Sequence, residues 1–430
     1  MVLRSTFKKL VWVGITVLGM NVCNFSIAEE PSKNITLAEA LDLMKENHPR
    51  IMAAQASLRG SEASLKGLQN LPLFAKFSPD LKIRKQQSAI GIEVTDAGLR
   101  QEIRDTSYGV ARAYYLVIYS KQQMLLTEHI LTILTKNIKA LELKMVLKKT
   151  PTDESSLLKL KLGYAEAKDK SSLASTGYAR AKALLIEEVG GRKKVGLLEP
   201  NEKELLNYKL SNYELSSLLT PAFIDEMVDK AVDAREEVIK SSKASEILSL
   251  EVAAQKTARF NPKFRTFASG SDVHYIPIGV QGRGENFTPE SITIEMPSTL
   301  VGKKVDRVAR AQAFADRGAA VEESTRNLIR LEVRNAFQQL LETRIRYDEL
   351  KKVEPELNKI INNLLENPLK FMTPEDAQTF ALAGRMLGSF NQAKFAGVDI
   401  LVDLERITSG VFSVGLTCPA TFTPDGKPIK

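Results

Sequence analysis

Two long stretches of the chain repeat apolar residues at spacings of three and four positions, which is the pattern of a coiled-coil helix. They lie at about 99–148 and 303–364. The apolar positions of the first are Val110, Ala113, Val117, Met124, Leu131, Leu134, Ile138 and Leu141, and those of the second are Val333, Ala336, Leu340, Tyr347, Leu350, Leu357, Ile361 and Leu364. So narrow a stripe predicts long helices that pack along their length, and the second would extend roughly 90 Å.

Each long helix is followed by a segment rich in small residues, at about 154–189 and 374–409. Alanine, serine and glycine recur throughout both segments, and such small residues allow helices to approach closely. These segments are predicted to return antiparallel to the long helices. An ordinary antiparallel bundle fits this pattern as well.

Two other parts of the chain alternate apolar and polar residues, as a strand with one wet face does. In 75–83 the apolar positions are Ala75, Phe77, Leu81 and Ile83, and in 291–296 they are Ile292, Ile294 and Met296. The segment 90–94 alternates in the same way. The pattern fits a barrel with lipid outside and water inside, and it equally fits a soluble half-buried sheet. Four strands cannot close a barrel alone, although several subunits could supply enough of them.

The chain contains an internal duplication. The sequence from Thr150 to Asp153 returns from Thr373 to Asp376, 223 positions later, and the same offset aligns Val110 with Val333. Residues 41–51 pair with 228–238 at an offset of 187, and 90–94 pair with 292–296 at 202. Each half therefore reads helix, two strands, long helix, turn, helix. The rise from 202 to 223 predicts that the first long helix is 21 residues shorter than the second, or about 30 Å.

Helix ends are marked by capping residues. Thr36 with Glu39 fits a capping box, and Thr220 with Pro221 supplies a cap and a first-turn proline. Glycines that end the two returning helices are expected at Gly190, Gly191 and Gly410.

The N-terminus has the features of a secretory signal peptide. Basic residues precede the apolar run LVWVGITVLGM, and small residues end at Ala28, after which we expect cleavage. Removing the three basic residues of this leader lowers the formal charge from +8 to +5, since 57 lysines and arginines then face 52 acids. That excess is too small to indicate a nucleic-acid partner. Of two cysteines, only Cys418 lies in the mature chain, so no internal disulfide is expected.

Nothing in the sequence predicts an enzyme. The three histidines, His48, His129 and His274, have no metal-ligand spacing, and no glycine-rich phosphate loop or nucleophile elbow is present. No catalytic residue, cofactor site or metal site is therefore predicted.

In its order of elements the chain resembles the outer-membrane efflux protein family, whose TolC-like members are the exit ducts of tripartite drug pumps and type I secretion systems. The residues that carry the resemblance are ITLAEALDLMKENHPRI, the small-residue helices, Asn261 to Phe264 before the second strand pair, Met296-Pro297 after it, and the two Thr-Pro turns. It covers about 36–410. It implies a mainly α fold with a small β part: long antiparallel coiled-coil hairpins form a periplasmic α-barrel, and four strands per subunit join a trimeric β-barrel.

The resemblance also assigns roles to the two turns. The resemblance implies that the hairpin tips contact a periplasmic adaptor protein. The tip residues are Thr150, Pro151, Thr152, Asp153, Thr373 and Pro374. The resemblance also implies that Asp376 and Glu375 line the periplasmic mouth or gate. Thr379 stands where the family commonly has a second acid. A structural role, in which these residues stop one helix and cap the next, explains the same sequence.

The predicted organisation is a signal peptide at 1–28, a first repeat at 29–215, a second repeat at 216–410 and a tail at 411–430. The first functional hypothesis is a homotrimeric duct in the outer-membrane lipid, working with an adaptor and an inner-membrane transporter in passive export of small molecules or proteins. The second is a periplasmic coiled-coil scaffold, or a degenerate relative, that does not insert. The sequence does not identify the cargo.

Overall fold

The computed structural model describes residues 33–71, 79–147, 151–191, 198–200, 220–257, 303–366 and 374–421. The described part of the first half contains β1 (Lys33–Ile35), α1 (Leu37–Asn47), α2 (Pro49–Gln69), α3 (Leu81–Leu147), α4 (Pro151–Glu188) and β2 (Leu198–Pro200). The described part of the second half contains α7 (Pro221–Ala234), α8 (Glu236–Thr257), α9 (Lys304–Glu366) and α10 (Pro374–Ile407). The signal peptide and the segment 258–302 lie outside the described residues.

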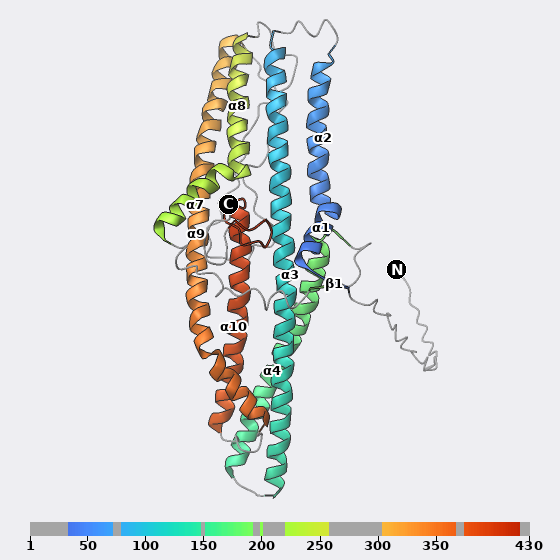
Figure 1. The fold of residues 1–430 in the computed structure, drawn as a ribbon, viewed down its shortest axis with the longest axis vertical. Coiled ribbons are helices and arrows are strands. Elements are labelled where there is room, and N and C mark those ends of the chain that lie inside the picture. The colour runs from blue at the N-terminus through green and yellow to red at the C-terminus, as the bar shows by residue number, and fades with distance from the viewer. Residues whose placement is uncertain are drawn as a thin grey trace, which may run out of the picture.

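The helices form an elongated molecule of four columns (Figure 1). The helices α3 and α9 each extend along most of its length, whereas the other two columns consist of stacked helices, α2 above α4 and α8 above α10. Helix contacts place the columns side by side in the order α2/α4, α3, α8/α10, α9. We call this layer of columns the wall. Its two edges are the α2/α4 column and α9.

The heptad stripes of the long helices form the core, as predicted. Val110, Ala113 and Val117 of α3 and Val333, Ala336 and Leu340 of α9 are buried in one cluster at the middle of the molecule. Phe337 meets Phe412 edge to face in the same cluster, which joins α9 to the segment after α10. Smaller apolar clusters continue the packing between α8 and α9 and between α3 and α4.

The capping predictions are confirmed. Thr36 accepts from the Glu39 amide at 3.2 Å, and the Glu39 carboxylate accepts from the Thr36 amide at 2.9 Å. Thr220 caps α7. Gly190, Gly191 and Gly410 all have positive φ, as glycines past a helix end should. One pairing was not predicted: β1 and β2 form a short parallel pair.

The strand prediction in the first half is wrong where the structure describes it. Residues 81–83 and 90–94 lie inside α3, and only 72–78 fall outside the described residues. The buried positions of this part of α3 have helical spacing, but several of them are polar: Arg84, Gln87 and Ser88. Because polar residues occupy buried positions, the helical spacing is not visible in the pattern of apolar residues. Those apolar residues alternate by chance, which suggested a strand.

The predicted shortfall of the first long helix is wrong for the same reason. The helix α3 has 67 residues and α9 has 63. Their first residues, 81 and 304, are 223 positions apart, so the offset of the hairpin tips already holds where the long helices begin. The length difference falls instead on the connections before them: 11 residues (70–80) between α2 and α3, and 46 residues (258–303) between α8 and α9.

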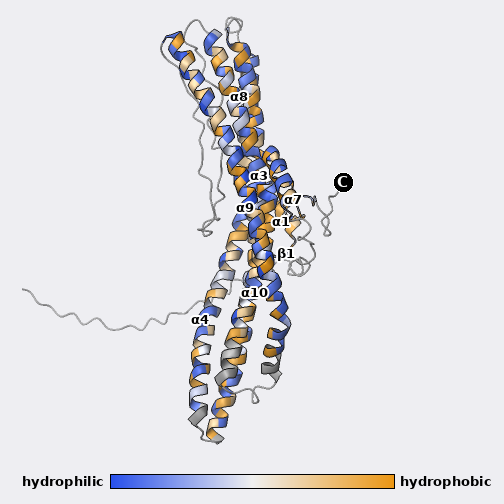
Figure 2. Ribbon diagram, turned by 90° about the vertical axis from the view of Figure 1, so that its left-hand side faces the viewer, coloured by the Kyte–Doolittle hydropathy of each residue, from blue (hydrophilic) through white to orange (hydrophobic). Residues whose placement is uncertain are grey.

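Polar and apolar residues are mixed along each helix (Figure 2). Within the described ranges no helix combines the length and the apolar character needed to cross a membrane.

Candidate functional site

The helices that begin at the two predicted hairpin tips, α4 and α10, start at the same end of the molecule (Figure 1). Pro151, Thr152 and Asp153 begin α4, and Pro374, Glu375, Asp376 and Thr379 lie in the first two turns of α10. Their side chains, and the whole of Thr150 and Thr373, lie outside the described part of the chain. The adaptor-contacting and gate roles of these nine residues stay predictions.

A groove of about 660 Å³ lies between α4 and α10, with α3 as its floor. Arg385 of α10 reaches across it to the Glu166 carboxylate of α4 at 3.2 Å. A hydrogen bond from Lys170 is the main reason that the pKa of Glu166 is lowered, and the Arg385 charge adds to it. The Gln123 amide of α3 donates to the Gly388 carbonyl at 3.3 Å. An exposed ion pair and a partly buried hydrogen bond thus join the two hairpins across the groove.

Near the middle of the wall, each stacked column has a joint. At the first joint, defined by Asn47, His48 and Pro49 with Gly190 and Gly191, α1 turns into α2 against the end of α4. At the second joint, defined by Arg235, Glu236 and Glu237 with residues 407–410, α7 turns into α8 against the end of α10. The two joints occupy corresponding places in the two halves, 187 positions apart at their first helices.

Arg235 connects the second joint. Its side chain is 2% exposed, and its guanidinium donates to Glu237 at 2.8 and 2.9 Å. The same group donates to the Ile407 carbonyl at 2.7 Å and pairs with Glu332 of α9 at 3.1 Å. The guanidinium therefore satisfies a carbonyl at the C-terminus of α10, where a cation is favoured.

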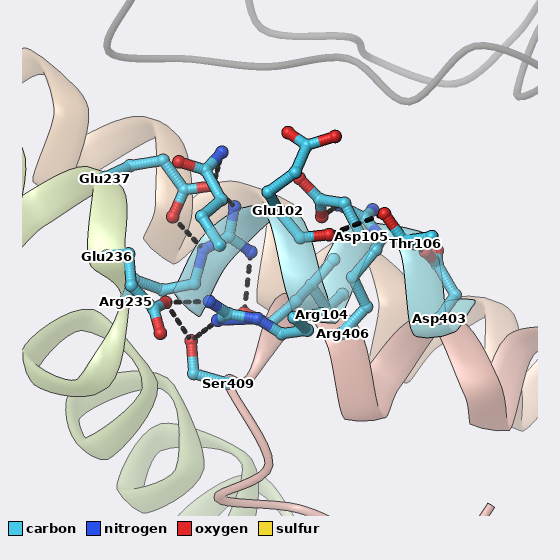
Figure 3. Close-up of polar contacts among 12 residues, drawn as sticks. Glu102, Arg104, Asp105, Thr106, Arg235, Glu236, Glu237, Asp403, Arg406 and Ser409 are labelled. Atoms are coloured by element: carbon cyan, nitrogen blue, oxygen red, sulfur yellow. Dashed lines mark hydrogen bonds and ion pairs between the residues drawn. The ribbon is translucent and has the colours of Figure 1, made fainter. Parts of the chain in front are cut away.

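Further charged side chains surround Arg235 (Figure 3). We define the equatorial charge cluster as Arg104, Asp105, Arg235, Glu236, Glu237, Glu332, Asp403 and Arg406. It joins α3, the second joint, α9 and the end of α10. Arg104 pairs with Glu236 and donates to Ser409, a residue held at φ 54°. Side chains from four elements thus meet in one buried network.

Two carboxylates of this cluster differ in protonation. Burial raises the pKa of both. At Glu237 the paired Arg235 guanidinium outweighs burial and lowers the pKa to about 2. At Asp105 burial prevails over Arg406 and raises the pKa to about 7. The partner, rather than depth alone, decides the charge of each group.

A second buried polar network lies at the other end of α3, away from the tips. Arg84 is 1% exposed and contacts Asp80 at 3.1 Å and both carboxylate oxygens of Glu251. Gln255 donates to Glu251 at 2.6 Å and accepts from Arg307 at 3.0 Å. These contacts hold the first turns of α3 and α9 against α8.

Neither network was predicted from the sequence. The one available signal was the run Arg235-Glu236-Glu237 at the position where the first half has Asn47-His48-Pro49. Three charges at the turn between two helices indicate ion pairs when the turn is buried, but burial is not visible in one sequence. Among the described residues, no group of three or more His, Cys, Asp or Glu side chains could hold a metal ion.

No family model matches the sequence, and no curated protein matches it significantly. Solved structures do match. The MtrE outer membrane channel of Neisseria gonorrhoeae is 13% identical with a TM-score of 0.64, covering 88% of this chain and 89% of that one. The outer-membrane channel OprN is 13% identical with a TM-score of 0.62, covering 89% and 91%. The CmeC outer membrane channel of Campylobacter jejuni is 13% identical with a TM-score of 0.61, covering 88% and 86%.

These likenesses cover nearly the whole chain and confirm the resemblance drawn from the sequence as one of fold. The helical part of the predicted fold class is confirmed with it. The solved structures named are channels and not enzymes.

Proposed function

We propose that this chain is one subunit of an outer-membrane exit duct that serves a tripartite efflux pump or a type I secretion system. The fold it shares with three outer membrane channels supports the proposal. The observation that carries it in this chain is the distribution of exposed apolar side chains on the wall.

Most of the large exposed apolar side chains lie at the two edges of the wall. Of twelve such residues among those described, five are on the α2/α4 column and three are on α9. They are Met52, Leu158, Leu162, Leu173 and Leu184 on the first edge and Val305, Leu331 and Ile345 on the second. The two columns inside the wall have the other four: Leu125, Leu143 and Val146 on α3, and Leu382 on α10. Apolar edges on a layer of helices favour lateral contact with another layer.

The two edges belong to different helices, so the contact between copies is head to tail. The α2/α4 edge of one subunit would meet α9 of the next, and such heterologous contacts form a ring when the rotation between subunits closes. We propose a homotrimer, the assembly implied by the family resemblance. The hairpin tips, including Asp376, would then surround the periplasmic mouth and meet an adaptor that links the duct to an inner-membrane transporter.

The first experiment is fractionation of the native envelope followed by an unheated gel of the mature protein. We expect an oligomer resistant to SDS that floats with outer membrane. Leu173→Asp on one edge and Ile345→Asp on the other should each abolish the ring, because a buried carboxylate in an apolar contact is costly. Leu143→Asp on α3, at a side chain 67% exposed but away from either edge, is the matched control and should leave the oligomer intact.

Mixing the two edge variants tests the head-to-tail arrangement. Each variant retains one intact edge, so a mixture should form dimers through the two unmodified edges and no closed ring. Restoration of full rings by mixing would contradict a heterologous contact, and a soluble monomer from the unmodified chain would contradict the duct itself.

One observation favours the alternative of a periplasmic coiled-coil scaffold that does not insert. A membrane-spanning strand needs about 9–11 residues. The 11-residue connection 70–80 is therefore too short for a spanning pair, whereas the 46 residues at 258–303 are long enough. Of these two connections, only the second could supply strands, and three subunits would give six, below the eight of the smallest membrane barrels. Flotation of the mature protein with outer membrane separates the duct from the scaffold.

A further inference from the structure

The equatorial charge cluster contains more acids than bases. Its cations are Arg104, Arg235 and Arg406, and its anions are Asp105, Glu236, Glu237, Glu332 and Asp403. Five minus three leaves two negative charges without a matching arginine. A buried excess of like charge is unfavourable unless one of the acids takes up a proton.

Four of the five acids have an arginine close by. Glu236 pairs with Arg104. The Arg235 guanidinium lies 2.8 Å from Glu237 and 3.1 Å from Glu332. The Arg406 guanidinium lies 2.9 Å from Asp403. Each of these four acids therefore has an arginine as a direct partner.

Asp105 is the exception. Its side chain is 6% exposed, and its closest cation is the Arg406 Nη1 atom, 3.9 Å from Oδ1. The other oxygen, Oδ2, is buried and has no hydrogen-bond partner within the described structure. A carboxylate with so few partners in a buried place pays a large desolvation cost, whereas a neutral carboxyl group does not.

The charged groups that act on Asp105 come from three of the elements around it. Arg104 lies on α3, Arg235 and Glu237 lie at the second joint, and Arg406 lies on α10. Glu332 of α9 and Asp403 of α10 both pair with Arg406. Burial, with Asp403 and Asp399 nearby, raises the pKa of Tyr108, so its hydroxyl stays neutral. The charge of Glu237 further opposes ionisation of Asp105.

We propose that Asp105 binds and releases a proton, and that this proton sets how tightly α3 is held against the second joint. With the proton bound, the cluster has one surplus negative charge and α3 packs closely. When the proton leaves, the new carboxylate repels Glu237 and the contact loosens. This regulation belongs to the joint itself and stands whether or not the chain is a duct.

The expected pH dependence follows from where the proton is held. An opened or unfolded chain loses the Asp105 proton near its ordinary pKa of about 4, while the packed chain keeps it until the raised pKa of about 7. Between these values the packed state binds more protons, so its stability falls as pH rises. The opening equilibrium constant should increase about tenfold per pH unit from pH 5 to 7 and level off above that.

Amide hydrogen exchange on the full mature protein measures this locally. Protection of segments 101–108 and 403–410, corrected for the intrinsic exchange rate at each pH, should fall from pH 5 to 7 and then level off. In Asp105→Asn, which resembles the protonated group, protection should be constant over the same range. Asp96→Asn, at an exposed site on the same helix, is the matched control and should retain the fall.

The network around Arg84 and Glu251 serves as an internal reference, because its acids lie next to arginine or glutamine partners. Protection of segments 84–90 and 248–255 should not follow the Asp105 profile. Equal protection of 101–108 at pH 5 and pH 7 in the unmodified chain would overturn the proposal without any variant. The same slope in Asp105→Asn as in the unmodified chain would also overturn it.

Discussion

At the first joint His48 ends α1 with φ −74° and ψ 124°, and at the second joint Arg235 ends α7 with φ −68° and ψ 129°. The backbone turn is the same, but the chemistry that holds it differs. His48 accepts a hydrogen bond from the Arg50 amide at 3.3 Å, and Pro49 begins α2. Arg235 instead reaches Glu237, Glu332 and the Ile407 carbonyl.

The stacked helices also meet differently at the two joints. Gly190, at φ 97°, lies so close to the turn that an added Cβ would be 2.7 Å from the Asn47 carbonyl carbon. At the second joint the Arg235 guanidinium instead links the turn after α7 to the Ile407 carbonyl at the end of α10. One column is therefore joined by backbone in close contact, and the other by buried ion pairs. Both turns need one extended residue between two helices, and either close backbone contact or buried ion pairs can hold that turn against the neighbouring helix.

The largest expected effect comes from removing the charge at the second joint. Arg235→Met leaves the buried Glu237 carboxylate without its partner and removes one of the two arginines next to Glu332, which should cost about 3–5 kcal/mol of unfolding free energy. The same change at the equivalent position, His48→Met, removes only a helix cap and should cost about 1 kcal/mol. Chemical denaturation of both mature variants at pH 7 measures the difference. Equal losses would show that the two joints are not held by different chemistry.

A smaller effect is expected from filling the close contact of the first joint. Gly190→Ala combines a left-handed backbone, costing about 1–2 kcal/mol, with overpacking against Asn47, costing about 1–3 kcal/mol. Gly191→Ala is the matched control, because its φ is 120° but nothing lies within 4 Å of an added Cβ. The midpoint temperature of thermal unfolding should therefore be lower for Gly190→Ala than for Gly191→Ala. The reverse order would mean that α4 does not press on the first joint.

Much of this architecture could be predicted from the sequence, because its determinants are local. Heptad spacing identified the buried seam at Val110, Val117 and Val333, and Thr36 and Thr220 marked helix starts that the structure confirms. Such signals depend on residues a few positions apart, which one sequence shows directly. The order of the long helices and of the helices that return from them was accessible in this way.

The buried charged residues could not be predicted from the sequence, for a physical reason. Arg84 and Arg235 read as surface residues, and their partners Glu251 and Glu332 lie 167 and 97 positions away. The same substitution of polar for apolar residues at buried positions hid the start of α3 and produced the wrong strand prediction. The gate and adaptor roles of the tips stay predictions.

The smallest expected effect is a change in the stability of the first joint with pH. Burial, together with the Arg50 charge, lowers the pKa of His48 below its ordinary 6.5. Below pH 6.5 the unfolded chain therefore takes up a proton that the folded first joint does not, so stability falls as pH drops toward the lowered pKa and is greatest above 6.5. The first joint should thus strengthen as pH rises through 6.5, while the second weakens up to pH 7. Exchange protection of segment 44–52 should follow the first trend and lose it in His48→Asn, which can still cap α2. A first joint that weakens with rising pH would contradict the assignment of these opposite responses to His48 and Asp105.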